Sequence, residues 1–409
     1  MKKTVKAKIR GLTKKQLKHL KNLCNSSKNL YNQALYAVRQ EYLKTEKYLN
    51  YYALDKLMKQ TANLEGNINY KMLKAGVSQQ ILRRLDKNYR SFFALIKKCP
   101  DMKPGPPKYI RGDYHSLIFD SQRFQVKNGC VVLDKVVSVK IPGCISDKKI
   151  VQVEIIPKFA YFSACFVYED DTDYKQVNQT GKVMGIDLGL NNLAACATTE
   201  GDLMLINGRP LKSINQFYNK KIAGIKSVLD TRNKQKWSKK AQHLTDRRNN
   251  KINDYHHKTS RRIVDFCLEN EVSKVVIGNV SHSIHNINLG KRNNQNFVNV
   301  SLGQFADKLG YKLEAHGIDV VMSDESYTSK ASFIDNDVLP EKYEPDTKHT
   351  FSGRRIKRGL YKSGKGILMN ADLNGAFNII RKAVPEFNFN KLKDGIEGRF
   401  IPHCRLSTC

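Results

Sequence analysis

The chain has 409 residues, of which 40% are apolar, and its 71 Lys and Arg against 38 Asp and Glu give a formal net charge of +33. The apolar share suffices for two or more hydrophobic cores and excludes a disordered protein. The positive charge is spread along the chain and favours an extended polyanion as partner. Nucleic acid fits better than a membrane, because no apolar run approaches the roughly 20 residues that cross a bilayer.

The N-terminal region begins with a strand and continues in helices. Residues 2–9 alternate as a short strand does, and Thr13 with Gln16 three residues later forms a capping box. This box predicts the start of an amphipathic helix with a lysine-rich face. Further helices are expected at 51–61 and 79–98.

A β-rich region follows the helices. From about 114 to 170 the apolar period becomes two, and Asn128-Gly129 indicates a hairpin turn. The N-terminal strand has no local partner, so we expect it to join this sheet. Residues 11–103 are then a helical insertion into a β-module made of residues 1–10 and 104–175.

The second half of the chain alternates strands and helices. A strand ending at Asp187 and two more strands form a predicted meander, and a helix, strand, helix, strand and closing helix follow. This order describes an RNase H-like α/β layer, in which the first strand lies centrally beside the later ones. The later elements are expected at 193–199, 202–207, 211–270 (two helices), 274–277, 302–315 and 319–322, with the last helix beginning at Asn370 and an irregular stretch at 329–369.

Carboxylates stand at three places that this layer brings together. Asp187 ends the first strand, Asp324-Glu325 follow the last strand, and Asp372 lies in the first turn of the closing helix. Hydrolysis of a phosphodiester by in-line attack uses two hard divalent cations about 4 Å apart, held by shared carboxylates. Each acid alone has a simpler explanation, as a turn cap, a helix-dipole partner or a surface residue. Their joint placement favours a metal site.

Four motifs carry a family resemblance. They are GIDLG at 185–189, NNQNF at 293–297, ESYTSK at 325–330 and NADLNGAFNI at 370–379. They resemble those of the transposon-encoded TnpB nucleases, relatives of the CRISPR type V effectors and the Fanzor proteins. The resemblance covers almost the whole chain.

The resemblance implies an α/β multidomain architecture. An RNase H-like (RuvC) nuclease domain would comprise 181–328 and 370–409, with a helical insertion at 211–270. The N-terminal module would be a β-barrel wedge domain interrupted by a helical recognition domain.

The resemblance also implies an activity and its partners. The protein would bind a guide RNA, read a short motif beside a double-stranded DNA target, and cleave the target with two Mg²⁺ ions, for which Mn²⁺ could substitute. We expect a monomeric ribonucleoprotein with no membrane partner. We expect it in the cytoplasm of a bacterium or archaeon, or in the nucleus if the host is eukaryotic.

One departure from the family concerns the middle metal ligand. The family usually has a glutamate after the fourth strand, whereas this chain has Gly278 within the sequence VVIGN at 275–279. Some relatives resemble this chain in placing a substitute glutamate at the next strand end, which here is Glu325. The resemblance therefore implies Asp187, Glu325 and Asp372 as metal ligands. Asp324 is the alternative in the middle place, but adjacent residues on a strand point in opposite directions, so only one of the two should reach the site.

The second departure is in residues 329–369, where many relatives bind zinc with two Cys pairs. This chain has no Cys there, so no zinc is expected. The segment is instead basic, and we expect it to contact nucleic acid near the catalytic cleft. The alternative is a solvated loop. The basic residues are Arg354, Arg355, Lys357, Arg358, Lys362 and Lys365.

Three other functions fit parts of the pattern. A nuclease-inactive RNA-guided repressor would keep the fold and lose the acids. An RNase H-like DNA transposase would use the same two-metal chemistry. A CRISPR-associated effector would differ in genetic context more than in chemistry.

Overall fold

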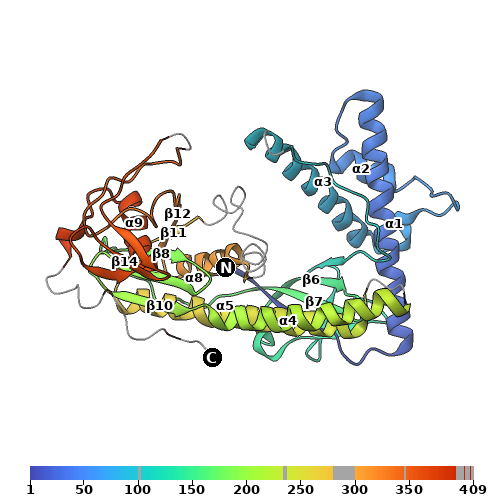
Figure 1. Ribbon diagram of the computed structural model, residues 1–409. Coiled ribbons are helices and arrows are strands. Elements are labelled where there is room, and N and C mark those ends of the chain that lie inside the picture. The colour runs from blue at the N-terminus through green and yellow to red at the C-terminus, as the bar shows by residue number, and fades with distance from the viewer. Residues whose placement is uncertain are drawn as a thin grey trace. The chain divides into compact units, whose positions relative to one another are not determined.

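The structure is a computed structural model that describes residues 1–99, 103–233, 237–279, 300–344, 347–392, 400 and 406. It divides into two compact units, Met1–Thr172 and Asp173–Cys409 (Figure 1). The motif at 293–297 lies outside the described residues. None of the helices in the described ranges has the length and apolar character needed to cross a membrane.

The N-terminal unit contains two antiparallel sheets. The first has the order β1-β7-β6-β2 and the second the order β3-β4-β5. As predicted, the N-terminal strand pairs with a distant one, with Lys2 opposite Glu169 and Lys8 opposite Ser163. The barrel expected for this unit stays a prediction. The strands are β1 (Lys2–Lys8), β2 (Leu117–Asp120), β3 (Gln125–Lys127), β4 (Cys130–Val132), β5 (Ser138–Lys140), β6 (Ile150–Pro157) and β7 (Phe162–Glu169).

Local sequence signals explain the turns and helix starts of this unit. Asn128 and Gly129 both have positive φ between β3 and β4, which confirms the hairpin. The capping box at Thr13 is also confirmed. α3 begins four residues before its predicted start. Its N-cap residue is Lys74, which makes no capping hydrogen bond and is not one of the residue types that mark a helix start in a sequence. The helices are α1 (Lys14–Thr45), α2 (Tyr51–Met58) and α3 (Ala75–Lys98), and they lie between β1 and β2 in the chain.

The C-terminal unit is built on a five-stranded mixed sheet with the order β10-β9-β8-β11-β12. β8, β9 and β10 form the predicted antiparallel meander, while β11 runs parallel to both β8 and β12. The predicted central place of the first strand, β8, is confirmed. The strands are β8 (Val183–Leu188), β9 (Asn192–Thr198), β10 (Leu203–Asn207), β11 (Lys274–Gly278) and β12 (Asp319–Ser323).

Helices cover both faces of this sheet. Met184, Ile186 and Leu188 of β8 belong to a core shared with α5 and α8, whereas Val183 belongs to a core shared with α9. Because side chains alternate along a strand, Asp187 lies on the same face as Val183, toward α9. The helices are α4 (Arg209–Val228), α5 (Lys239–Glu269), α8 (Leu302–Glu314) and α9 (Ala371–Ala383).

Residues 354–370 form a small sheet where the sequence predicts irregular structure. The strands β13 (Arg354–Lys357), β14 (Leu360–Lys362) and β15 (Leu368–Asn370) are antiparallel, with a turn at Gly359, whose φ is +87°. Strands of three or four residues are too short to show an alternating pattern, so the prediction of an irregular stretch is wrong here. The buried Tyr361 anchors this sheet by donating its hydroxyl hydrogen bond to Lys330 O at 2.7 Å.

Two histidines, the half-buried His115 and the buried His256, give the fold a predictable dependence on pH. Burial lowers the pKa of His115 and that of His256 from 6.5 to about 4. In the unfolded chain these histidines bind a proton below about pH 6.5. Their contribution to the free energy of unfolding is therefore fully present above that pH and is lost as the pH falls toward 4. We expect each histidine to contribute a loss of about 2 kcal/mol between pH 7 and pH 5.

Denaturant titrations at pH 7 and pH 5 measure this loss. Between pH 7 and pH 5, the free energy of unfolding of the variant His256→Phe should fall less than that of the wild type. An equal loss in both proteins would contradict a buried, neutral His256.

Candidate active site

Asp187 lies against the beginning of α9. A Cβ atom added to Gly375 would stand 2.6 Å from Asp187 Oδ2, so the carboxylate occupies the space that this glycine leaves. Asp372 is in the first turn of the same helix, and Asn370 caps the helix by accepting hydrogen bonds from the backbone of Asp372 and Leu373. The packing of α9 on β8 therefore brings two of the predicted acids together.

Glu325 lies over the end of β11. It follows β12 by two residues, and β12 pairs with β11 so that Ser323 is opposite Gly278. A Cβ atom added to Gly278 would stand 2.2 Å from Glu325 Oε1 and 2.8 Å from its Cδ. The carboxylate of Glu325 thus occupies the space that a side chain at position 278 would fill.

Asp324 is engaged elsewhere. Its Oδ1 accepts hydrogen bonds from Ser326 N at 2.7 Å and Lys382 Nζ at 3.1 Å. Burial raises the pKa of Asp324, but these bonds and the Lys382 charge outweigh it, and the net pKa is lowered. The ammonium of Lys382 therefore already neutralises Asp324.

The pKa values of Asp187 and Glu325 are both raised. Burial raises the pKa of Asp187 well above its ordinary value, and the charges of Asp372 and Glu325 raise it further, whereas Arg355 acts in the opposite direction. Burial and then the Asp324 charge raise the pKa of Glu325 to about 7, against the effect of Lys382. A nearby cation would favour the ionised form of Asp187, whose pKa the neighbouring carboxylates raise.

The donor set fits a hard divalent cation. All three acids offer oxygen atoms, which Mg²⁺ and Mn²⁺ prefer. Glu325 Oε1 is buried and has no hydrogen-bond partner, which is a position that a cation or its water could satisfy. In the described ranges, no group of three or more His, Cys, Asp or Glu side chains is arranged to hold an ion as it stands.

The sequence analysis missed two contacts of the site. Asn192, which is 2% exposed, donates from Nδ2 to Asp372 Oδ2 at 2.7 Å, although the two residues are 180 positions apart. Its position at the start of β9, four residues after the end of β8, could have suggested a role beside Asp187. The pairing of Lys382 with Asp324 has no comparable signal.

The four basic residues predicted to bind nucleic acid lie on β13 and its turn. Arg354, Lys357 and Arg358 are exposed. Arg355 is also exposed, but its Nη2 lies 3.7 Å from Asp372 Oδ1. The basic segment therefore reaches the acidic cluster.

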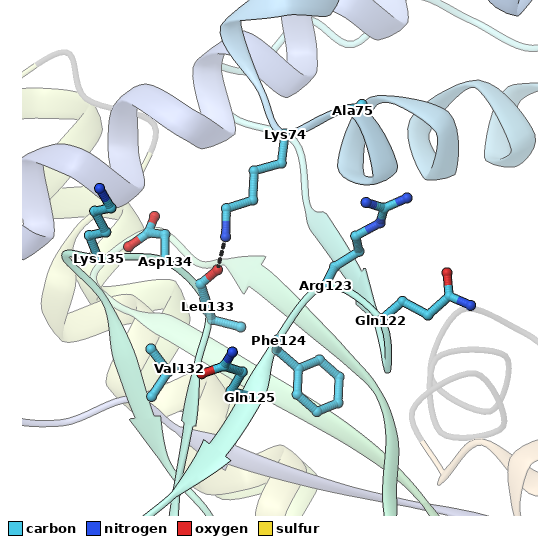
Figure 2. A pocket seen from close by; sticks show the side chains of 10 residues that line it. All are labelled: Lys74, Ala75, Gln122, Arg123, Phe124, Gln125, Val132, Leu133, Asp134 and Lys135. Atoms are coloured by element: carbon cyan, nitrogen blue, oxygen red, sulfur yellow. Dashed lines mark hydrogen bonds between the residues drawn. The ribbon is translucent and has the colours of Figure 1, made fainter.

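The N-terminal unit contains a hollow of about 720 Å³ where the start of α3 approaches the sheet of β3, β4 and β5 (Figure 2). Lys74 spans part of it and donates a hydrogen bond to Leu133 O at 2.7 Å. Arg123, Gln122 and Phe124 stand on another side of the hollow in Figure 2. Its complete lining is Lys74, Ala75, Gln122, Arg123, Phe124, Gln125, Val132, Leu133, Asp134 and Lys135.

Two parts of the chain match known protein families. Residues 165–283 match the family of probable transposases OrfB_IS605, and residues 303–379 match the TNB domain of Cas12f1-like proteins. The TnpB-like protein ORF457 of Acidianus two-tailed virus is 27% identical over 210 residues, which are 50% of this chain and 42% of that relative. The matched part thus spans less than half the length of this relative.

A solved structure shows a similar fold. The structure of a Cas12f1–sgRNA–target DNA complex matches with a TM-score of 0.54 at 16% identity, covering 90% of this chain and 83% of that one. At this identity the likeness concerns the α/β multidomain fold alone. The two family matches and the viral relative support a TnpB family for this chain.

Proposed function

We propose that this protein is an RNA-guided, divalent-metal-dependent DNA endonuclease, in which base pairing to a guide RNA selects the target. The observation that carries the proposal is the placement of the Glu325 carboxylate over Gly278, which supplies an acid where the usual one is missing. Family membership supports the same reading, and the Cas12f1 neighbour is a complex with an sgRNA and target DNA.

In this proposal Asp187, Glu325 and Asp372 hold the metal ions. When bound, the two ions activate a water molecule and stabilise the leaving oxygen of the phosphodiester. The chain contributes the arrangement of the acids: β8 carries Asp187, α9 carries Asp372, and Asn192 keeps one oxygen of Asp372 engaged. Lys382 keeps Asp324 paired, so Glu325 is the middle ligand.

Other described residues suit the proposed partners. In the hollow of the N-terminal unit, arginine and glutamine are side chains that read base edges, and lysine contacts phosphates. The hollow therefore suits the recognition of a short motif in the target duplex. A second hollow of about 300 Å³ in the C-terminal unit is lined by Phe217, Arg247, Arg248 and Lys251 among others, which suits a guide RNA.

The nature of the copurifying RNA tests this function. The full chain, expressed together with the DNA that flanks its gene, should purify with one discrete structured RNA. Sequencing that RNA gives the guide and hence the target to assay. A protein that carried no discrete RNA and joined DNA ends would be a transposase and would contradict the proposal.

A further inference from the structure

Asp372 is held by two partners of different character. On one side, buried Asn192 donates a hydrogen bond to Oδ2 at 2.7 Å. On the other, Nη2 of Arg355 stands 3.7 Å from Oδ1. The side chain of Asn192 is fixed by burial, whereas the side chain of Arg355 is 45% exposed. Of the two partners, only the arginine is free to move away.

The fold delivers Arg355 to this position. In the pairing of β13 with β14, Arg355 is opposite the buried Tyr361, while Arg354 is opposite Lys362. Neighbouring residues on a strand face opposite sides, so Arg354 points away from the side that Arg355 shares with Tyr361. The turn of this hairpin is attached to the active-site helix, because Ala371 N donates to Gly359 O at 3.1 Å.

From this geometry we propose that Arg355 is the resident cation of the acidic cluster, and that a divalent metal ion displaces it from Asp372. The inference rests on the proposed function, because it assumes that Asp372 is a metal ligand.

Elementary electrostatics supports the exchange. Three carboxylates brought close together repel one another unless a positive charge is near, and a guanidinium supplies that charge at any ordinary pH. A contact of 3.7 Å between partly exposed groups is weak, so a divalent ion bound directly to Oδ1 can replace it. Asn192 keeps its bond to the other oxygen during the exchange.

The exchange links metal binding to nucleic-acid binding. Once released, Arg355 joins Arg354, Lys357 and Arg358 on the exposed strand and its turn, where its charge is available to a phosphate. A phosphate that engages Arg355 in turn frees Asp372 for the metal. Such coupling is reciprocal, so each ligand favours the other.

Calorimetric titration of the RNA-free full chain with Mg²⁺ tests the proposal. The variant Arg355→Gln should bind Mg²⁺ about three- to fivefold more tightly than the wild type, which is the scale of one partly exposed ion pair. Arg354→Gln is the matched control, because it removes the same charge from the neighbouring position on the opposite face. Circular dichroism and thermal melting establish that each variant is folded.

The outcomes separate the inference from the function on which it rests. Unchanged or weaker Mg²⁺ binding by Arg355→Gln, or equal tightening in Arg354→Gln, would overturn the displacement model. Asp372→Asn tests the site itself and should weaken Mg²⁺ binding. If Asp372→Asn bound Mg²⁺ as the wild type does, the metal site, and with it the proposed function, would fail.

Discussion

Asp187→Asn is expected to lower the rate of target cleavage by more than about a thousandfold while guide-dependent target binding stays within about twofold of wild type. The substitution keeps the size of the side chain and removes the charge that would hold a metal. Asp187 lies beside the backbone of Gly375, so a side chain of equal size preserves the packing of α9 on β8. Asp372→Asn should have the same effect.

Cleavage time courses and gel-shift titrations with the same ribonucleoprotein measure the two properties separately. Asp319→Asn is the matched control, because it removes an exposed carboxylate at the start of β12, whereas Glu325 follows the end of that strand. Cleavage by Asp187→Asn at a rate near that of the control would remove Asp187 from the catalytic site.

Gly278→Ala is expected to disable cleavage although it adds only a methyl group. The new Cβ would stand 2.2 Å from Glu325 Oε1, so one of the two must move. Glu325 is a flexible side chain at that point, and moving its carboxylate is easier than moving β11. The variant should therefore keep its thermal stability and lose at least about a hundredfold in cleavage rate, as expected when a charged catalytic group is displaced.

Direct substitution of the two candidate acids complements this test. Glu325→Gln should lose cleavage as Asp187→Asn does, whereas Asp324→Asn should cleave within a few fold of wild type, because Lys382 already pairs with Asp324. The double variant Gly278→Glu with Glu325→Gly returns the acid to the usual strand and should recover part of the activity. Normal cleavage by Glu325→Gln together with loss in Asp324→Asn would exchange the roles of the two residues.

The sequence allowed much of the C-terminal unit to be predicted. β8 to β12 and their helices have strong apolar patterns and clear turns, and topology rules then place β8 in the centre of the sheet. The same topology led to Asp187, Asp324-Glu325 and Asp372 as candidates. The choice of Glu325 over Asp324 stays a prediction, but the space above Gly278 and the pairing of Asp324 with Lys382 support it.

The features that could not be predicted depend on contacts between distant residues. The hydrogen bond between Asn192 and Asp372 and the ion pair between Arg355 and Asp372 leave no periodic trace in the chain. The strands β13, β14 and β15 are too short to show an alternating pattern. The basic segment that was predicted to be irregular is a sheet whose hairpin turn is hydrogen-bonded to the start of α9. Side chains that act across such distances become visible only in the folded structure.

The most direct test of the whole account is cleavage of a plasmid by the purified ribonucleoprotein. With a guide-matched target and Mg²⁺, the plasmid should be cut, and removal of the metal with EDTA, replacement of the target by a mismatched one, or Asp187→Asn should each prevent it. An intact plasmid under the complete conditions, with tight target binding retained, would contradict the account and identify the protein as an RNA-guided repressor.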